Sequence, residues 1–466
     1  MRFELPRLML AAPASNTGKT TLTIALLQAL KNRGMAPVAY KCGPDYIDPM
    51  FHREVLGVPG YNLDLFFSTP NTVLNLLAAK ATTADIAIME GVMGYYDGAG
   101  MTEEASSWHL ASETVTPAVL VVRPGGASLS IAALVKGILE FRENSQIKGV
   151  VLNDCKPVMA DRLATLIARE CGIKVFGCLP DAADAKIGSR HLGLVAPEEV
   201  AGFKEKACLL AQLLEENADI EGLLALAGEA PSCNVQPHKL SPVADVDKGV
   251  RIGIAQDEAF CFYYRENLEL LESLGATLVY FSPLHDTTLP TNISGLYFGG
   301  GYPELHAEAL SANFAMRDAV ARAIGQGLPT IAECGGFLYL QQQLEDAEGV
   351  SHPMVSALEG EGYNRQKLDR FGYVSLTACE DNLICKQGDT IKGHEFHYWD
   401  STQAGSGFIA QKPHSKRQWP CVQASQYLYA GFPHLYFWSN LQCATRFVAA
   451  SATYQESAHY SRAKEQ

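Results

Sequence analysis

Two groups of residues in this chain could carry out chemistry, although they lie more than three hundred residues apart. Cys334 stands in the segment TIAECGGFLYLQQQL, where a short apolar run meets two glycines and then a helix-like pattern. At such a strand-to-helix corner the thiol lies beside free peptide N–H groups and the positive end of a helix dipole, which favours the thiolate. The sequence therefore predicts a nucleophilic cysteine.

The second group is the segment APASNTGKTT, residues 12–21, which has the pattern of a phosphate-binding loop. Such a loop combines backbone amides that cradle phosphate, a lysine for the terminal phosphates and a hydroxyl for Mg²⁺. Lys19 and Thr20 take the last two places, although Pro13 stands where a glycine is usual. The alternative, a glycine-lined turn with an exposed lysine, is disfavoured by the strand-loop-helix context. We expect ATP to contact Asn16, Thr17, Gly18, Lys19, Thr20 and Thr21.

Two acidic segments follow apolar runs, KCGPDYIDP (41–49) and MEGVMGYYDG (89–98). Open α/β sheets bind ligands at the carboxyl ends of their strands, so these carboxylates are expected around the same crevice as Lys19. Carboxylates beside a triphosphate hold Mg²⁺, which prefers hard oxygen ligands. The alternative is that the aspartates only form turns beside glycine and proline. The carboxylates concerned are Asp45, Asp48, Glu90 and Asp97.

To attack an amide carbonyl, Cys334 needs a base and an oxyanion hole. FGGGYPELH (298–306) resembles a strand that ends in three glycines, so the amides of Gly300 or Gly301 are expected to face Cys334 and to form the hole with Gly335. His434, in AGFPHLYFWSN, is the candidate base, and the alternative is a buried histidine packed among aromatic residues. With an ATP site in the same chain, the simplest chemistry joins amide nitrogen to a carboxylate that ATP activates.

The elements that must position these residues form two series. In the first half, short apolar runs alternate with amphipathic helical segments, which is typical of a parallel sheet buried on both faces. A polar, proline-containing stretch interrupts the pattern near 228–248, and a second α/β series begins at 250. We predict an α/β fold with domains at 1–230 and 249–466 and a linker at 231–248. From 350 onward the pattern predicts no definite order of elements.

Composition limits the function. The chain has 466 residues, a net charge of −14 and 12 scattered cysteines without a CxxC pair, so neither a disulfide framework nor a zinc site is expected. The charge opposes binding to nucleic acid or an anionic membrane. No apolar run is long enough to span a membrane and no secretory signal fits before the phosphate loop, so a cytoplasmic location is expected. An anionic substrate would need a local cluster of basic residues. Four residues after apolar runs could supply this positive charge, and the alternative is that they are ordinary surface charges: Lys41, Arg123, Arg190 and His191.

Together the motifs resemble one family over nearly the whole chain. The first half is similar to the dethiobiotin-synthetase-like ATP domain, and residues 250–445 are similar to a class I glutamine amidotransferase module. Joined in this order, they resemble the cobyrinate a,c-diamide synthases. The motifs that carry this resemblance are KCGPDYIDP, EGVMGYYDG, SRHLGL (189–194), GGGYPE, ECGGF and GHEFHY (393–398). The resemblance implies two doubly wound domains, an N-terminal P-loop ATPase-like parallel sheet and a C-terminal flavodoxin-like domain.

The resemblance also implies roles for individual residues. Nucleotide and Mg²⁺ binding fall to Lys19, Thr20, Asp45 and Glu90, adenine-side contacts to Asn153 and Pro180, and substrate binding to Tyr46 together with the basic residues named above. Asp48 and Asp97 would act beside the activated carboxylate. Cys334 and His434 would form the glutaminase pair. The chain departs from the usual triad, because Leu435 and Tyr436 follow His434 where a glutamate is expected, and Ala332 replaces a glycine at the elbow.

The implied reaction uses ATP, L-glutamine and Mg²⁺ to amidate the a and c acetate groups of a corrinoid through acyl phosphates. Ammonia released at Cys334 must then reach the acyl phosphate, so the two active sites are expected to face each other. Three alternatives stay open among enzymes: a nickel-sirohydrochlorin or a hydrogenobyrinate a,c-diamide synthase, and a cobyric acid synthase. A ParA-like ATP switch is the alternative outside enzymes. The expected partners are small molecules, and a homodimer stays open.

Overall fold

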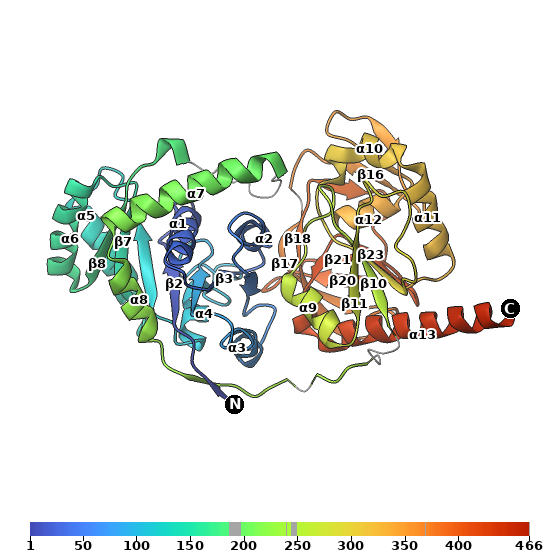
Figure 1. Ribbon diagram of the computed structural model, residues 1–466, viewed down its shortest axis with the longest axis horizontal. Helices are drawn as coiled ribbons and strands as arrows, with labels where there is room; N and C mark the ends of the chain where they lie inside the picture. Colours follow the sequence, from blue (N-terminus) through green and yellow to red (C-terminus); the bar gives the residue numbers. More distant parts are fainter. Residues whose placement is uncertain (186–196, 239, 244–248, 369, 466) are drawn as a thin grey trace. The chain divides into compact units, whose positions relative to one another are not determined.

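The chain divides into two units, Met1–His238 and Lys239–Gln466 (Figure 1). In this computed structural model the described residues are 1–185, 197–238, 240–243, 249–368 and 370–465. The division falls within the stretch 231–248 that the sequence analysis interprets as a linker. Each unit has its own sheet and its own hydrophobic core, so the two are described separately.

The first unit is built on a seven-stranded sheet in which every neighbouring pair is parallel. The chain passes from one side of β2 to the other between β5 and β6, so the strand order reverses next to β2. Ligands of open α/β sheets bind at such a point. In spatial order the strands are β4 (Gly60–Leu63), β3 (Pro37–Cys42), β5 (Ile86–Glu90), β2 (Arg7–Ala11), β6 (Ala118–Val122), β7 (Ile147–Asn153) and β8 (Lys174–Leu179).

Helices cover both faces of this sheet, because alternate residues of its apolar strands pack to opposite sides. Met9 belongs to one core cluster and Leu10 to the other. The first cluster takes in α3 (Pro70–Ala78), α4 (Ser107–Glu113), α5 (Leu129–Glu140) and α6 (Pro157–Cys171). The second takes in α1 (Lys19–Asn32), α2 (Ile47–Glu54), α7 (Pro197–Asn217) and α8 (Ile220–Gly228). A 3-10 turn η1 (Ala183–Ala185) follows β8, and β1 (Arg2–Phe3) pairs with β9 (Cys233–Asn234).

The second unit has a six-stranded sheet that is parallel except for its last strand. Its order is β11 (Thr277–Phe281), β10 (Arg251–Ala255), β12 (Gly295–Phe298), β13 (Thr330–Glu333), β23 (Leu428–Gly431) and β22 (Gln423–Ser425). Its helices are α9 (Arg265–Ser273), α10 (Ala307–Ala312), α11 (Phe314–Gly325), α12 (Gly335–Leu340) and α13 (Leu441–Glu465), with 3-10 turns η3 (Pro303–His306) and η4 (Phe437–Ser439). The prediction of two doubly wound α/β domains is confirmed.

Two further sheets, mostly antiparallel, complete the second unit, and all their strands except β14 lie after residue 350, where the sequence predicted no order. One is β15 (Ser351–Pro353), β14 (Gln343–Glu345), β16 (Glu361–Asn364) and β19 (Trp399–Ser401), in which only the β14–β16 pair is parallel. The other is β21 (Gln418–Cys421), β20 (Phe408–Gln411), β17 (Phe371–Ala378), β18 (Thr390–Phe396) and β24 (His434–Leu435). The short β24 pairs His434 with His394 of β18, so this sheet positions the candidate base. Across the described ranges, none of the helices is both long and apolar enough to cross a bilayer.

Candidate active sites of the two units

The phosphate loop connects β2 to α1 and is closely fitted to the end of β7. Gly18 has φ of 98°, and a Cβ placed on it would lie 2.0 Å from Nδ2 of Asn153. Only glycine is compatible with both the left-handed backbone and this close approach. The same Asn153 amide donates to the Thr17 carbonyl at 3.0 Å. The loop is therefore held in one shape, directly ahead of the free N–H groups at the start of α1.

Lys19 and Thr20 connect the loop to the segment that follows β5. Nζ of Lys19 donates to the Met93 carbonyl at 2.6 Å and to the Ala14 carbonyl at 3.3 Å. Burial lowers the pKa of Lys19 to about 8, and the positive charge of Lys41 acts in the same direction. The Thr20 hydroxyl donates to Oε1 of Glu90 at 2.6 Å. Both side chains predicted to bind phosphate and metal thus lie beside the predicted carboxylates.

A buried ion cluster lies at the ends of β3 and β5. Nζ of Lys41 is 2.5 Å from Oδ2 of Asp48 and 2.7 Å from Oε1 of Glu90, and the three side chains are at most 7% exposed. Burial disfavours the charge of Lys41, but the two carboxylates hold its pKa well above the usual value. Burial likewise opposes ionisation of Asp48, yet Lys41 keeps the pKa of Asp48 below its usual value. Lys41 is thus an internal counter-ion and not the ordinary surface charge that was the alternative interpretation of this lysine. Its role toward a substrate stays a prediction.

Two carboxylates of this region line the cavity and have raised pKa values, and one of them keeps an oxygen without a partner among the described residues. Burial, and then the charge of Asp48, raise the pKa of Asp45 to about 6. Burial also raises the pKa of Glu90, whose Oε2 is buried and has no hydrogen-bond partner among the described residues. Within the same residues no cluster of three or more His, Cys, Asp and Glu forms a closed metal site. An unpartnered carboxylate oxygen beside the Thr20 hydroxyl nevertheless fits Mg²⁺, which takes few protein ligands and completes its shell with phosphate and water.

These side chains line a cavity of about 490 Å³ at the carboxyl end of the sheet. Its lining includes nine of the residues predicted from the sequence, which are Asn16, Gly18, Lys19, Thr20, Thr21, Lys41, Asp45, Asp48 and Glu90. The structure therefore brings together the loop and both acidic segments. The individual roles of these residues stay predictions.

Other predicted residues of this unit lie outside that lining. The Asp97 carboxylate is exposed and accepts from the Gly94 N–H at 3.0 Å. Arg123 follows β6 and forms an ion pair with Asp154 at 2.5 Å, half exposed. Three more, Tyr46, Asn153 and Pro180, occupy positions at or after the ends of β3, β7 and β8. Arg190 and His191, with the segment SRHLGL, lie outside the described residues.

In the second unit Cys334 occupies a sharp corner between β13 and α12. Its backbone has φ of 47° and ψ of −104°, and its N–H donates to the Gly431 carbonyl at 2.8 Å. The predicted strand-to-helix elbow is present. The expectation of a resting thiolate is wrong, because burial raises the pKa of Cys334 well above its usual value and the nearby charge of Glu304 adds to this shift. The helix that follows has only six residues.

The three glycines predicted for the oxyanion hole converge around this corner. A Cβ placed on Gly335 would lie 3.1 Å from the Gly301 nitrogen. A Cβ on Gly300 would lie 2.2 Å from Cε1 of His434, so the imidazole packs directly over this glycine. The Gly300 carbonyl accepts hydrogen bonds from the N–H groups of Cys261 and Phe262, both at 3.0 Å. These bonds fix the orientation of the peptide group at Gly300. The candidate nucleophile, base and backbone donors thus share one small region.

Reasoning from sequence missed a carboxylate at this site. Nδ1 of His434 lies 3.9 Å from Oε2 of Glu333, and both side chains are 2% exposed. Burial lowers the pKa of His434 to about 3, with His394 and His397 acting in the same direction, so the imidazole is neutral. Burial raises the pKa of Glu333 to about 8. The signal was present in the sequence, because Glu333 directly precedes Cys334.

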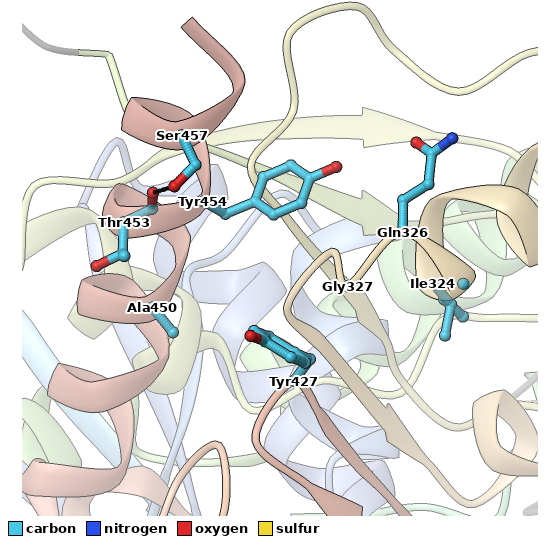
Figure 2. Close-up of a pocket in the computed structure, with 9 residues that line it drawn as sticks. Ile324, Gln326, Gly327, Tyr427, Ala450, Thr453, Tyr454 and Ser457 are labelled. Carbon is cyan, nitrogen blue, oxygen red and sulfur yellow. Dashed lines mark hydrogen bonds between the residues drawn. The ribbon is translucent and has the colours of Figure 1, made fainter. Parts of the chain in front are cut away.

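A larger hollow of about 760 Å³ lies elsewhere in the second unit, between the end of α11, the β22–β23 turn and α13 (Figure 2). Tyr427 and Tyr454 are its main side chains, with Gln326 and Thr453 at its sides. None of the residues that line it is an Asp, Glu, His, Cys or Lys. Its hydroxyl groups have no histidine, carboxylate or amine beside them in the lining to activate them, so we do not assign it a catalytic role.

Comparison with known families gives one matching domain in each of the two units. Residues 8–195 match the model of the CobQ/CobB/MinD/ParA nucleotide binding domain. Residues 251–441 match the model of the CobB/CobQ-like glutamine amidotransferase domain. The phosphate loop belongs to the first match, and both Cys334 and His434 belong to the second.

Relatives extend the similarity to nearly the full length. The chain is 38% identical to a cobyrinate a,c-diamide synthase of Caldanaerobacter subterraneus subsp. tengcongensis, over 94% of this chain and 97% of the relative. It is 37% identical to one of Listeria monocytogenes, over 95% and 99%. It is 35% identical to one of Thermoplasma volcanium, over 97% and 99%.

Proposed function

Because this chain belongs to the cobyrinate a,c-diamide synthase family, we propose that it amidates the a and c acetate groups of cobyrinate in cobalamin biosynthesis. It is a glutamine-hydrolysing ligase, with an ATP-binding domain and a glutamine amidotransferase domain. The single observation that carries the proposal is that one chain contains both a phosphate-loop cavity and a strand-to-helix elbow at Cys334 with His434 in the same region. Each site supplies one half of an ATP- and glutamine-dependent amidation.

In the first unit the reaction begins with activation of the substrate carboxylate. The loop amides and Lys19 hold the terminal phosphates of ATP, while a substrate carboxylate oxygen attacks the γ-phosphorus and ADP leaves. The product is an acyl phosphate, in which the poor leaving oxygen of the carboxylate has become phosphate. Thr20, Asp45 and Glu90 would hold Mg²⁺, which supplies positive charge against the phosphate oxygens when bound. The cluster of Lys41, Asp48 and Glu90 supports this role for Glu90, because it fixes the Glu90 carboxylate at the cavity wall.

Positioning of the corrinoid is assigned by similarity to the family. Tyr46, Lys41 and Arg123 lie within or after β3 and β6 of the same sheet. Arg190 and His191, outside the described residues, are assigned by the resemblance alone. For Lys41 the role is indirect, since its ammonium is already paired with two carboxylates. Asp48 and Asp97 would act beside the carboxylate being activated, and Asn153 and Pro180 on the adenine side.

In the second unit glutamine provides the nitrogen. His434 takes the thiol proton of Cys334 as the sulfur attacks the amide carbonyl, and the oxyanion is stabilised by amides of Gly300 or Gly301 and Gly335. His434 then gives the proton to the leaving nitrogen, so ammonia departs and a glutamyl thioester remains. Water hydrolyses the thioester to glutamate. Ammonia displaces phosphate from the acyl phosphate and forms the amide.

The setting of the reaction is part of the proposal. The substrates are small molecules, namely a corrinoid, ATP and glutamine, and Mg²⁺ is the metal. We place the enzyme in the cytoplasm, and a homodimer stays open. Neither nucleic acid nor membrane binding is part of this function.

A product assay with three tetrapyrroles tests the proposal. Purified full-length protein is incubated with ATP, Mg²⁺, glutamine and one of cobyrinate, hydrogenobyrinate or nickel-sirohydrochlorin, and products are read by mass. We expect cobyrinate to gain two amides. A preference for either other tetrapyrrole would reassign the substrate. ATP hydrolysis without amidation of any of the three tetrapyrroles would overturn the proposed ligase activity.

A further inference from the structure

The glutaminase site contains a buried carboxylate that the mechanism above does not use. Glu333 is the last residue of β13 and directly precedes the nucleophile. Its Oε1 accepts from the Leu435 N–H at 2.9 Å, and Leu435 is the residue after His434. Its Oε2 lies 3.9 Å from Nδ1 of the His434 imidazole. One side chain thus contacts both the backbone and the ring of the segment that carries the base.

The surroundings of Glu333 and His434 make a charge on either side chain costly in free energy. Each of the two side chains is only 2% exposed, so water does not compensate a charge that forms there. The Tyr297 hydroxyl hydrogen-bonds the carboxylate, and Tyr263, Tyr429 and Cys334 also lie near it. His394 and His397 are the titratable groups next to His434 from the β18 side. Glu304 and Glu395 also act on the Cys334 thiol. Glu333 is the carboxylate that lies 3.9 Å from the imidazole, so its negative charge can offset an imidazolium.

From this geometry we infer that Glu333 is the positioning residue of the glutaminase, taking the place of the glutamate that usually follows the base. When His434 accepts the thiol proton, its ring becomes a cation in a buried site. The carboxylate at the Nδ1 side then stabilises that cation and keeps Nε2 as the nitrogen that exchanges protons with the reacting atoms. The general requirement is a base that is itself oriented by a third group.

The burial shifts agree with a pair whose charges form together. Burial holds the pKa of His434 at about 3 and that of Glu333 at about 8, so each charge alone is unfavourable. An imidazolium beside a carboxylate removes much of this cost, because opposite charges within about 4 Å favour each other's ionised form. The pair requires Glu333 to have released its own proton to solvent, as it does above pH 8. The ion pair then forms when His434 takes the proton of the Cys334 thiol.

This inference rests on the proposed Cys334–His434 glutaminase, and the test separates the two. Full-length protein is treated with iodoacetamide at pH 8.5, above the pKa of Glu333, and modification of the Cys334 peptide is followed by mass. Unmodified protein is compared with His434→Ala, Glu333→Gln and the double variant. Glutamine retains an acceptor for the Leu435 N–H and the Tyr297 hydroxyl but carries no charge.

We expect His434→Ala and Glu333→Gln each to slow modification of Cys334 by roughly tenfold or more. The double variant should be no slower than His434→Ala, because Glu333 acts through the imidazole. In steady state, Glu333→Gln should lower kcat for glutamine without raising KM, and amidation with ammonium chloride should be retained. Glu304→Gln is the matched control: its charge also acts on the Cys334 thiol, so its removal should not slow modification.

Each other outcome has a definite meaning. If His434→Ala does not slow modification, the proposed base is wrong and the glutaminase assignment falls with it. If His434→Ala slows modification but Glu333→Gln does not, only the role of Glu333 is overturned. A further slowing by Glu333→Gln in the His434→Ala background, or a raised KM for glutamine, would make Glu333 a structural residue of the corner.

Discussion

Lys41 and Thr20 donate to the same oxygen, Oε1 of Glu90, at 2.7 and 2.6 Å. One carboxylate oxygen therefore joins the phosphate loop to the end of β3, and the other, Oε2, stays without a partner among the described residues. The ATP site is connected through buried charges and not only through the backbone of the loop. This connection leads to the first prediction.

Lys41→Met should destabilise the first unit by about 3–5 kcal/mol, because it leaves two buried carboxylates without their counter-ion. Hydrogen–deuterium exchange of peptides from Met1–His238 checks this, since their protection should fall while peptides of the second unit keep theirs. Lys148→Met is the matched control: this exposed lysine of β7 should change stability by less than about 0.5 kcal/mol. Equal protection in Lys41→Met and Lys148→Met would show that the cluster contributes nothing to stability.

Lys19→Ala should abolish ATP-dependent amidation with glutamine and with ammonium chloride alike, because the terminal phosphates lose their fixed cation. ADP release and product mass are measured with both nitrogen sources. Glutamine hydrolysis at Cys334 should persist at its basal rate. ATP turnover that survives the substitution would mean that residues 12–21 are only a turn.

Cys334→Ser should remove amidation from glutamine and keep amidation from ammonium chloride near its original rate. Only the nitrogen source depends on the thiol, whereas the acyl phosphate forms in the first unit. Cys379→Ser, at an exposed cysteine of the same unit, serves as the control and should keep both activities. Loss of both activities in Cys334→Ser would assign Cys334 to the structure instead.

The stability of the second unit should fall between pH 6.5 and 8. Burial raises the pKa of Glu333 to about 8, so the folded state holds a proton that the unfolded state has already lost above pH 4.5. Such a proton lowers the unfolding free energy by at most about 1.4 kcal/mol per pH unit as pH rises through this window. The buried histidines act the other way, since a lowered pKa makes stability rise with pH, but their effect ends near pH 6.5.

Urea unfolding at four pH values between 6.5 and 8 measures this slope. Fluorescence of Trp399, Trp419 and Trp438 reports on the second unit in a Trp108→Phe background. Glu333→Gln should reduce the slope by an amount that corresponds to up to one proton, about 1.4 kcal/mol per pH unit. A slope that is the same in both proteins would show that the folded and unfolded states bind the same number of protons at Glu333, so that its pKa is not raised into this window.

The parts that sequence predicted well are those that depend on local patterns. The phosphate loop, the elbow at Cys334 and the glycines at 300, 301 and 335 are each specified by a short run of residues with a definite backbone requirement. The carboxyl ends of parallel strands meet at one edge, so Asp45, Asp48 and Glu90 could be placed together from their position after apolar runs.

The parts that sequence missed depend on contacts between distant segments. The partners of Lys41 come from α2 and from β5, and nothing near Lys41 in the sequence shows that its charge is buried. The pairing of β18 with β24, which brings His394 beside His434, joins strands forty residues apart. Glu333 was overlooked because a family pattern places the third catalytic group after the histidine, whereas here the fold brings it from the strand that precedes the nucleophile.

A thiol that is held protonated at rest also has a consequence for the lifetime of the enzyme. Peroxides oxidise the thiolate and not the thiol, so the raised pKa of Cys334 protects it from conversion to sulfenic and sulfinic acid while no glutamine is bound. Cys208 and Cys379 are exposed and would be oxidised first, away from the elbow. The burial that raises the pKa of Cys334 therefore also predicts slow oxidation of this thiol in the resting state.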